Sequence, residues 1–234
     1  MRDYLLFVDT ETSGIPKDWH APYADNSLWP YIVQLAWVVY TRDGQFVKEE
    51  NYYISDNDFK ISRASQEIHG ISRAYLLENG QSRQEVMQQL KEDLEAFQPL
   101  IVGHYVKLDY HMLGVEFFRT QLDNPVAGLP TFCTMMVTDD YIRYPFRKYL
   151  SLGELYKRLT QKPLAKPHNA LTDAQATATC FFVMRERGDI NEEKINRQKA
   201  VQTEKPSSSK TKTSIYVYII LALLFFMLLI FFQL

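Results

Sequence analysis

Two carboxylates one residue apart, Asp9 and Glu11, end an apolar run near the start of the chain. The run at 5–8 and the Ser-Gly turn at 13–14 predict a strand that is buried on both faces. Side chains two positions apart on a strand project to the same side, so both carboxylates point beyond the strand end together. A hard divalent cation such as magnesium takes oxygen ligands and relieves their repulsion. The pair is half of a metal site, although a solvated strand end is the commoner interpretation of such a pair alone.

Two further aspartates fall in the first turns of predicted helices. Asp109 follows the short apolar strand 100–103 and a brief loop, and Asp173 begins the helix predicted at 170–187. Each has an ordinary explanation on its own, because helix N-termini favour negative charge. Together with the strand-end pair, however, they supply four oxygen ligands of the kind that two magnesium ions use for in-line phosphoryl displacement.

His168 lies on the loop just before the helix that carries Asp173. A histidine about one helical turn from a metal-binding aspartate can deprotonate a water molecule, because its ordinary pKa lies near working pH. A lone histidine is more often structural. The neighbouring carboxylates favour a general base here.

The apolar spacing elsewhere predicts the elements that position these residues. Segments 31–40 and 45–54 are rich in β-branched and aromatic residues and flank a turn at 41–44, which indicates an antiparallel meander with the first strand. Beyond it, helices and short strands alternate, as in an α/β fold with parallel crossovers. The expected helices are 65–69, 82–97, 108–119, 151–159 and 170–187, and the expected strands are 100–103 and a short one within 131–141.

One long connection, 15–30, carries three prolines and two tryptophans. Long loops without secondary structure are uncommon in compact domains unless they have a function, so we expect an ordered loop near the end of the first strand.

Composition sets broad limits on the function. The 234 residues, 46% of them hydrophobic, are enough for one full core with an appendage. The net charge of −2 provides no basic field over the whole protein, so any nucleic-acid binding must be local. The only two cysteines, Cys133 and Cys180, lie far apart, which favours reduced thiols in a cytosol-facing domain.

The end of the chain differs in composition from the domain predicted at 1–188. Segment 189–214 is charged and rich in Ser, Thr and Lys, which predicts a flexible linker. Segment 215–232 has no charge, proline or glycine and is long enough to cross a bilayer, so we expect a transmembrane anchor rather than a buried core helix. Lysines precede this segment and none follows it, which places the domain on the cytoplasmic side of a membrane.

Three short motifs resemble those of the DEDDh, or DnaQ-like, 3′-to-5′ exonuclease family. They are Asp9-Thr10-Glu11-Thr12 after an apolar strand, Gly103-His104 followed by Asp109, and His168 followed five positions on by Asp173. Ile68-His69-Gly70-Ile71-Ser72 also resembles the family's His-Gly-Ile segment. The resemblance covers about residues 4–187.

This resemblance implies a ribonuclease H-like fold, in which helices flank a mixed five-stranded sheet of an antiparallel meander and parallel strands. It implies two Mg²⁺ or Mn²⁺ ions, with Asp9 bridging both, Glu11 and Asp173 completing the tighter site, and Asp109 holding the second ion through water. His168 is the implied general base, and Glu11 is catalytic as well as a ligand. The residues implied to hold the 3′-terminal nucleotide are Thr10, Glu11, Thr12, His69 and His168.

Two positions depart from the family pattern. Tyr105 stands where relatives usually carry Asn, and Leu108 stands where they carry Phe. Because of these two departures, the family resemblance does not predict which terminal base is preferred. The set of metal ligands is complete.

The function these features predict is a membrane-anchored, metal-dependent exonuclease that hydrolyses single-stranded 3′ ends to nucleoside 5′-monophosphates. Of the two nucleic acids, DNA is the substrate that we predict first. An RNA-trimming exoribonuclease of the same family is the alternative within the enzyme class. A non-catalytic, membrane-tethered nucleic-acid-binding module is the alternative outside it, and the presence of all five expected catalytic residues argues against that module.

Overall fold

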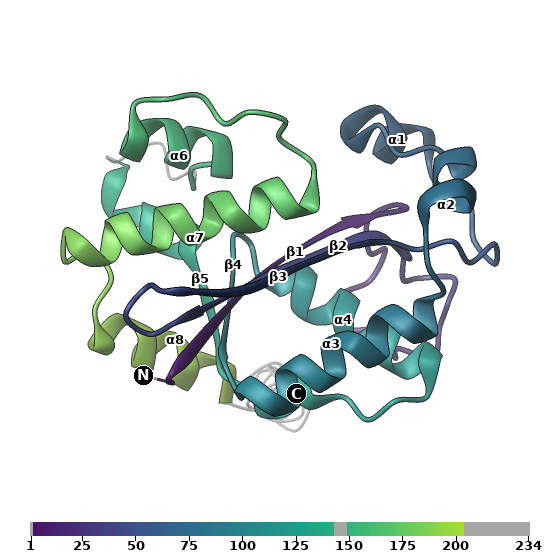
Figure 1. Ribbon diagram of the computed structural model, residues 1–234, viewed down its shortest axis with the longest axis horizontal. Helices are drawn as coiled ribbons and strands as arrows, with labels where there is room; N and C mark the ends of the chain where they lie inside the picture. The colour runs from purple at the N-terminus through teal and green to yellow at the C-terminus, as the bar shows by residue number, and fades with distance from the viewer. Residues whose placement is uncertain (1, 143–148, 204–234) are drawn as a thin grey trace, which may run out of the picture. The chain divides into compact units, whose positions relative to one another are not determined.

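A computed structural model describes residues 2–142 and 149–203 (Figure 1). The chain divides into two units, Met1–Lys199 and Ala200–Leu234, and the description below concerns the first. Its centre is a five-stranded sheet in the order β3-β2-β1-β4-β5. The strands are β1 (Tyr4–Thr12), β2 (Ile32–Thr41), β3 (Phe46–Tyr53), β4 (Leu100–Gly103) and β5 (Thr131–Cys133). The first three strands are antiparallel, and β4 and β5 run parallel to β1, which confirms the predicted mixed sheet.

Strand β1 is the central strand, and the side chains of 5–8 are fully buried. Alternate residues belong to different cores, as the period of two requires. Leu6 and Val8 pack in one hydrophobic cluster, and Leu5 and Phe7 pack in another. The continuous apolar run is therefore explained by helices on both faces of the sheet.

The helices lie in two layers on either side of the sheet, with α3 and α4 below it and α6 and α7 above it in Figure 1. The α-helices are α1 (Arg63–His69), α2 (Arg73–Asn79), α3 (Arg83–Phe97), α4 (Lys107–Thr120), α5 (Thr134–Val137), α6 (Leu152–Thr160), α7 (Ala170–Glu186) and α8 (Glu192–Thr203), and the short 3-10 helices are η1 (Pro125–Gly128) and η2 (Thr138–Tyr141). Capping boxes at Ser82 with Glu85 and at Ser151 with Glu154 begin α3 and α6. These boxes satisfy backbone N–H groups that a helix start leaves unpaired.

The predictions for the end of the chain need correction. Segment 189–214 was expected to be a flexible linker, but helix α8 occupies part of it. Ile195 of α8 is fully buried in the core cluster of Leu5 and Phe7, and the Gln198 side chain accepts a hydrogen bond of 2.7 Å from the backbone N–H of Cys133. Among the described side chains of α8, Ile195 and Gln198 thus help to fix a helix of charged composition to the domain.

The predicted membrane localisation is contradicted for the part of the chain that the structure describes. Across residues 2–142 and 149–203, no helix is long and apolar enough to cross a bilayer. The segment in which the anchor and its lipid contact were predicted, 215–232, lies outside the described residues.

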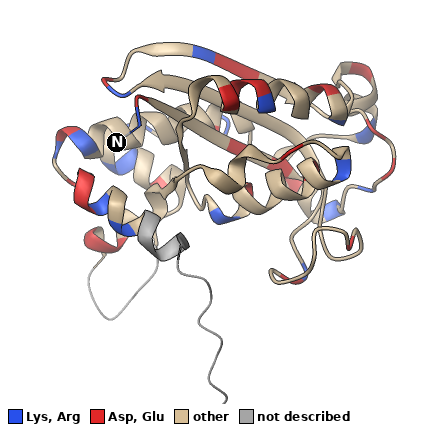
Figure 2. Ribbon diagram, turned by 90° about the horizontal axis from the view of Figure 1, so that it is seen from below, with Lys and Arg blue, Asp and Glu red and all other residues tan. Residues whose placement is uncertain are grey.

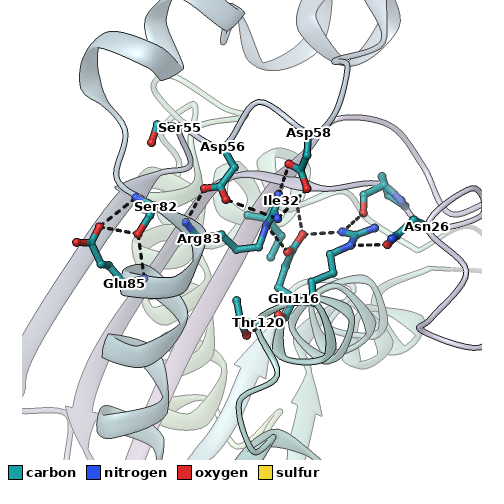
Figure 3. A network of polar contacts seen from close by, with 12 residues as sticks. Asn26, Ile32, Ser55, Asp56, Asp58, Ser82, Arg83, Glu85, Glu116 and Thr120 are labelled. Atoms are coloured by element: carbon teal, nitrogen blue, oxygen red, sulfur yellow. Dashed lines mark hydrogen bonds and ion pairs between the residues drawn. The ribbon is translucent and has the colours of Figure 1, made fainter.

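A buried ionic network joins the start of β2 to helices α3 and α4 (Figure 3). The Glu116 side chain, 1% exposed, lies 2.8 Å from the Arg119 guanidinium and 2.8 Å from that of Arg83. It also accepts a hydrogen bond of 3.1 Å from the backbone N–H of Ile32. Arg83 continues the network to Asp58 at 2.8 Å. One buried carboxylate therefore fixes the end of loop 15–30 to two helices.

Replacement of Glu116 by Ala leaves two guanidinium groups without their buried partner. We expect Glu116→Ala to lower the free energy of unfolding in urea by about 3–5 kcal/mol. The exposed pair of Arg63 and Glu67 is the control, because Glu67→Ala at a surface (i, i+4) pair costs at most about 0.5 kcal/mol. Equal losses for the two variants would contradict the structural role of Glu116.

Candidate active site

The site forms where the C-terminal end of β1 meets the starts of α4 and α7. Phe7 of β1 lies opposite Val102 of β4 in parallel register, so β4 ends at Gly103 beside the part of β1 that leads into Asp9. The turn from β4 into α4 is tight, since a Cβ at Gly103 would lie 3.0 Å from the Val106 side chain. This turn brings Asp109, in the first turn of α4, to the end of β1.

Helix α7 is brought to the same place by Gln34, a residue that the sequence analysis missed. Gln34 lies opposite Glu11 in the β1–β2 register, is fully buried, and accepts a hydrogen bond of 3.1 Å from the backbone N–H of Ala170. Its amide donates to Asn51 at 2.8 Å. A single polar residue inside the apolar run of β2 was the available signal for this contact. Gln34 thereby holds the first turn of α7, with Asp173, beside Glu11.

The structure brings together all four carboxylates and the histidine that the sequence predicted. Possible ligand atoms of Glu11, His168 and Asp173 lie within 4.8 Å of one another. The charges of Asp109, Asp173 and Glu11 each raise the pKa of Asp9, which adds to the larger effect of burial. The four acids therefore share one electrostatic environment.

Burial holds these carboxyls above their ordinary pKa values, and repulsion from neighbouring carboxylates adds to its effect at Asp9 and Glu11. Burial, followed by the charges of Asp173 and Asp109, raises the pKa of Glu11 to about 8. Burial raises the pKa of Asp109 to about 7, against the opposing effect of a hydrogen bond of 2.8 Å from the Thr10 hydroxyl. The pKa of Asp173 is raised by burial, although the backbone N–H of His168 donates to it at 3.0 Å.

The donor set fits a hard divalent cation. All four acids offer oxygen ligands, and Oδ1 of Asp173 is buried without a hydrogen-bond partner among the described residues. A buried carboxylate oxygen without a partner is costly unless a cation reaches it. A bound ion would also lower the raised pKa values by favouring the charged carboxylates. The residues present can therefore hold divalent metal at this site.

His168 differs from the acids because its side chain is exposed. Its backbone is left-handed, with a φ of 64°, which is uncommon for a residue other than glycine. The hydrogen bond from its N–H to Asp173 ties this turn to the first turn of α7. The imidazole is thus placed at the rim of the site, between solvent and the ligand atoms of Glu11 and Asp173.

Two of the residues predicted to hold a nucleotide, Thr12 and His69, lie together where the end of β1 meets α1. The Thr12 hydroxyl donates to the Gly14 carbonyl at 2.7 Å, and the backbone N–H of Ser62, which caps α1, donates to the Ser13 carbonyl at 2.8 Å. This contact brings His69, at the end of α1, to Thr12. Burial lowers the pKa of His69, and the nearby charge of His168 lowers it further. The Thr10 side chain is used within the site, because its hydroxyl is bonded to Asp109.

Charge elsewhere on the molecule is mixed. In Figure 2 basic and acidic residues are interspersed along the ribbon, which agrees with a net charge of −2. Any attraction for an anionic polymer must therefore come from a few side chains and bound metal near the site.

Comparison with known proteins defines the class. The family model described as Exonuclease (RNase T) matches residues 6–181, which is most of the chain. The protein therefore belongs to this exonuclease family, and it is a nuclease by family and fold. No curated protein matches the chain.

Solved structures agree with this assignment at the level of the fold. E. coli exonuclease I bound to a dT13 oligonucleotide has a TM-score of 0.65 at 17% identity, over 80% of this chain and 42% of that one. The zinc-bound complex of the same enzyme with single-stranded DNA has a TM-score of 0.66 at 17% identity, over 83% and 42%. Cell-death related nuclease 4 has a TM-score of 0.61 at 15% identity, over 80% and 65%. The chain thus spans less than half the length of exonuclease I.

The raised pKa values predict how stability depends on pH when metal is absent. The folded protein holds protons that the unfolded chain has already released above about pH 4, so the free energy of unfolding falls as pH rises toward 8. We expect Asp9→Asn to reduce this loss and, in EDTA at pH 8, to stabilise the protein by about 1 kcal/mol, or about 2–4 °C in Tm.

Thermal unfolding in EDTA at pH 5 and pH 8 measures this effect. Magnesium should raise the Tm of the wild-type protein at pH 8, and it should do so less for Asp9→Asn. Asp43→Asn, in the exposed turn between β2 and β3, is the control and should behave as wild type. An unchanged pH dependence in Asp9→Asn would show that burial and neighbouring charges do not raise the pKa of Asp9 in the folded protein.

Proposed function

We propose that residues 1–188 form a DEDDh-type, metal-dependent 3′-to-5′ exonuclease that acts on single-stranded nucleic-acid ends. The observation that carries this proposal is the meeting of four carboxylates and an exposed histidine at the end of β1. Family membership supports nuclease chemistry. The similar fold of exonuclease I, which was crystallised with single-stranded oligonucleotides, supports DNA as the first substrate to test.

In the proposed reaction, Asp9, Glu11, Asp109 and Asp173 hold two Mg²⁺ or Mn²⁺ ions. When bound, these ions supply Lewis-acid stabilisation of charge on the reacting phosphate. Thr10 keeps Asp109 in place through its hydroxyl. Gln34 keeps the start of α7 in place, and with it Asp173.

His168 acts as the general base at its imidazole nitrogen. It takes a proton from the water that attacks the terminal phosphorus, and the bond from phosphorus to the 3′ oxygen of the preceding nucleotide breaks. The products are a nucleoside 5′-monophosphate and a strand shorter by one nucleotide. Glu11, Thr12 and His69 line the end of β1 where the 3′-terminal nucleotide rests, with Thr10 and His168 beside them.

Digestion of matched single-stranded DNA and RNA oligonucleotides tests the proposal. With a 5′ label, the wild-type protein in Mg²⁺ should give a ladder that shortens from the 3′ end, and 5′-mononucleotides should accumulate. EDTA or Asp9→Ala should abolish the release, whereas Asp43→Asn should not change it. Faster digestion of RNA would select the exoribonuclease alternative. Binding of both oligonucleotides without shortening would leave only the non-catalytic module.

The role of His168 is separable from metal binding. We expect His168→Ala to retain Mg²⁺-dependent thermal stabilisation and to lose about 10²- to 10⁴-fold in kcat, which is the usual contribution of a general base. Single-turnover digestion together with thermal unfolding in Mg²⁺ measures both properties. Turnover at the wild-type rate in His168→Ala would remove it as the base.

A further inference from the structure

An aromatic platform, formed by Trp19, Tyr105 and Lys107, includes two residues of the turn that leads into Asp109, and it has no part in the proposed hydrolysis. The Trp19 and Tyr105 rings meet edge to face, with centroids 6.1 Å apart and planes at 74°. The Lys107 ammonium lies 4.8 Å from the centroid of the Trp19 ring. Tyr105 is 40% exposed, and Lys107 is exposed as well. The platform thus offers an aromatic face and a positive charge to solvent.

The platform is built on the turn that positions a metal ligand. Tyr105 and Lys107 precede Asp109 by four and two residues, and Lys107 is the first residue of α4. The Tyr105 carbonyl accepts a hydrogen bond of 3.0 Å from the backbone N–H of Leu108. Tyr105 and Lys107 therefore lie within about one helical turn of Asp109 along the chain.

The backbone of Tyr105 is unusual for a large side chain. Its φ is 72°, in the left-handed region that bulky residues rarely adopt. Such conformations persist only where the surroundings impose them, and they concentrate at functional sites. In this conformation the large ring is left partly in solvent instead of in the core.

Loop 15–30 is firmly held, so Trp19 is presented by a rigid support. Trp29 is buried, stacks on His111 with centroids 5.4 Å apart, and donates its indole N–H to the Ala21 carbonyl at 3.3 Å. The Tyr23 hydroxyl lies 3.0 Å from Nδ1 of His111. A Cβ at Gly114 would come within 2.6 Å of the Tyr23 ring, so only glycine permits this close packing of the loop on α4.

The other end of the loop is fixed by Arg119. Its guanidinium donates to the carbonyls of Pro30 at 2.8 Å and Trp29 at 3.1 Å, and to the Asn26 side chain at 2.9 Å. The network of Figure 3 therefore also positions the platform. A rigid, partly exposed aromatic surface binds without the entropy cost of ordering a mobile loop.

We propose that the aromatic platform is a nucleotide subsite. The exposed ring of Tyr105, backed by Trp19, stacks on one unpaired base of the strand, and the Lys107 ammonium attracts a backbone phosphate. This inference rests on the proposed function, because it names where that substrate lies beyond the carboxylates. Stacking on an aromatic side chain is tolerant of sequence, and it requires a base that is free of its complementary strand. The platform thereby selects single-stranded ends.

A double-mutant cycle between the ring and the base tests this assignment. Binding of a fluorescent single-stranded DNA oligonucleotide is measured by anisotropy in Ca²⁺, for the intact strand and for strands with an abasic residue at each of the last four positions. Tyr105→Asn removes the ring and keeps the backbone, because Asn tolerates the left-handed region. We expect Tyr105→Asn to weaken binding of the intact strand about 5- to 150-fold. For the strand that lacks the stacked base, Tyr105→Asn should cause no further loss of affinity.

Two matched variants control the cycle. Tyr105→Phe keeps the ring and should bind as wild type. Phe46→Ala removes a ring of similar exposure on β3 and should leave binding unchanged. Trp19→Ala should cause no further loss of affinity for the same abasic strand that Tyr105→Asn identifies. Equal weakening by Tyr105→Asn on every strand, or none on any, would overturn the subsite.

Failure of this inference can be distinguished from failure of the proposed function. The cycle reads binding and does not depend on turnover. A wild-type protein that binds the strand without shortening it in Mg²⁺ disproves the exonuclease, and the cycle still decides the subsite. If the strand is shortened normally but the effects of Tyr105→Asn and of the missing base on affinity simply add, the exonuclease stands and the subsite is overturned. A wild-type protein that does not bind the strand also overturns the subsite.

Discussion

The burial of four carboxylates close together at the end of β1 is the constraint on which the rest of the structure depends. Burial and neighbouring charges raise the pKa of Asp9, and those of Glu11 and Asp109 reach about 8 and 7. Such a cluster opposes folding of the metal-free chain near neutral pH. The surrounding elements must therefore hold the acids together until cations are bound, and the scaffold supplies that stability from apolar packing on both faces of β1.

Polar contacts close to the site complete this support. Thr10 bonds to Asp109, and Gln34 bonds to the first turn of α7 across from Glu11. Both side chains are buried and paired, so each fixes an element that carries a proposed metal ligand, and neither adds charge. The network around Glu116 acts farther away, where it joins loop 15–30 to α3 and α4.

The sequence predicts the sheet, the helices near the site and the four acids because each of these leaves a local pattern. Apolar runs and capping residues mark element boundaries, and strand periodicity places Asp9 and Glu11 together. Contacts between distant residues leave no such pattern. Gln34 appears only as a polar interruption of β2, and its bond to Ala170 depends on how α7 crosses the sheet. Helix α8 was missed because the burial of Ile195 is hidden in a charged composition. The outward ring of Tyr105 depends on a backbone angle that composition does not predict.

The contrast between buried acids and an exposed histidine follows from the proposed chemistry. Carboxylates that hold metal gain from burial, since a low dielectric strengthens their attraction for a cation. A general base must release its proton to water after each turnover, so it belongs at the rim. In this chain His168 binds Asp173 through its backbone N–H and not through its side chain. The imidazole is therefore exposed, while the carboxylate of Asp173 is buried. In the proposed mechanism, the left-handed turn at His168 is therefore the backbone feature that would separate proton transfer from metal binding.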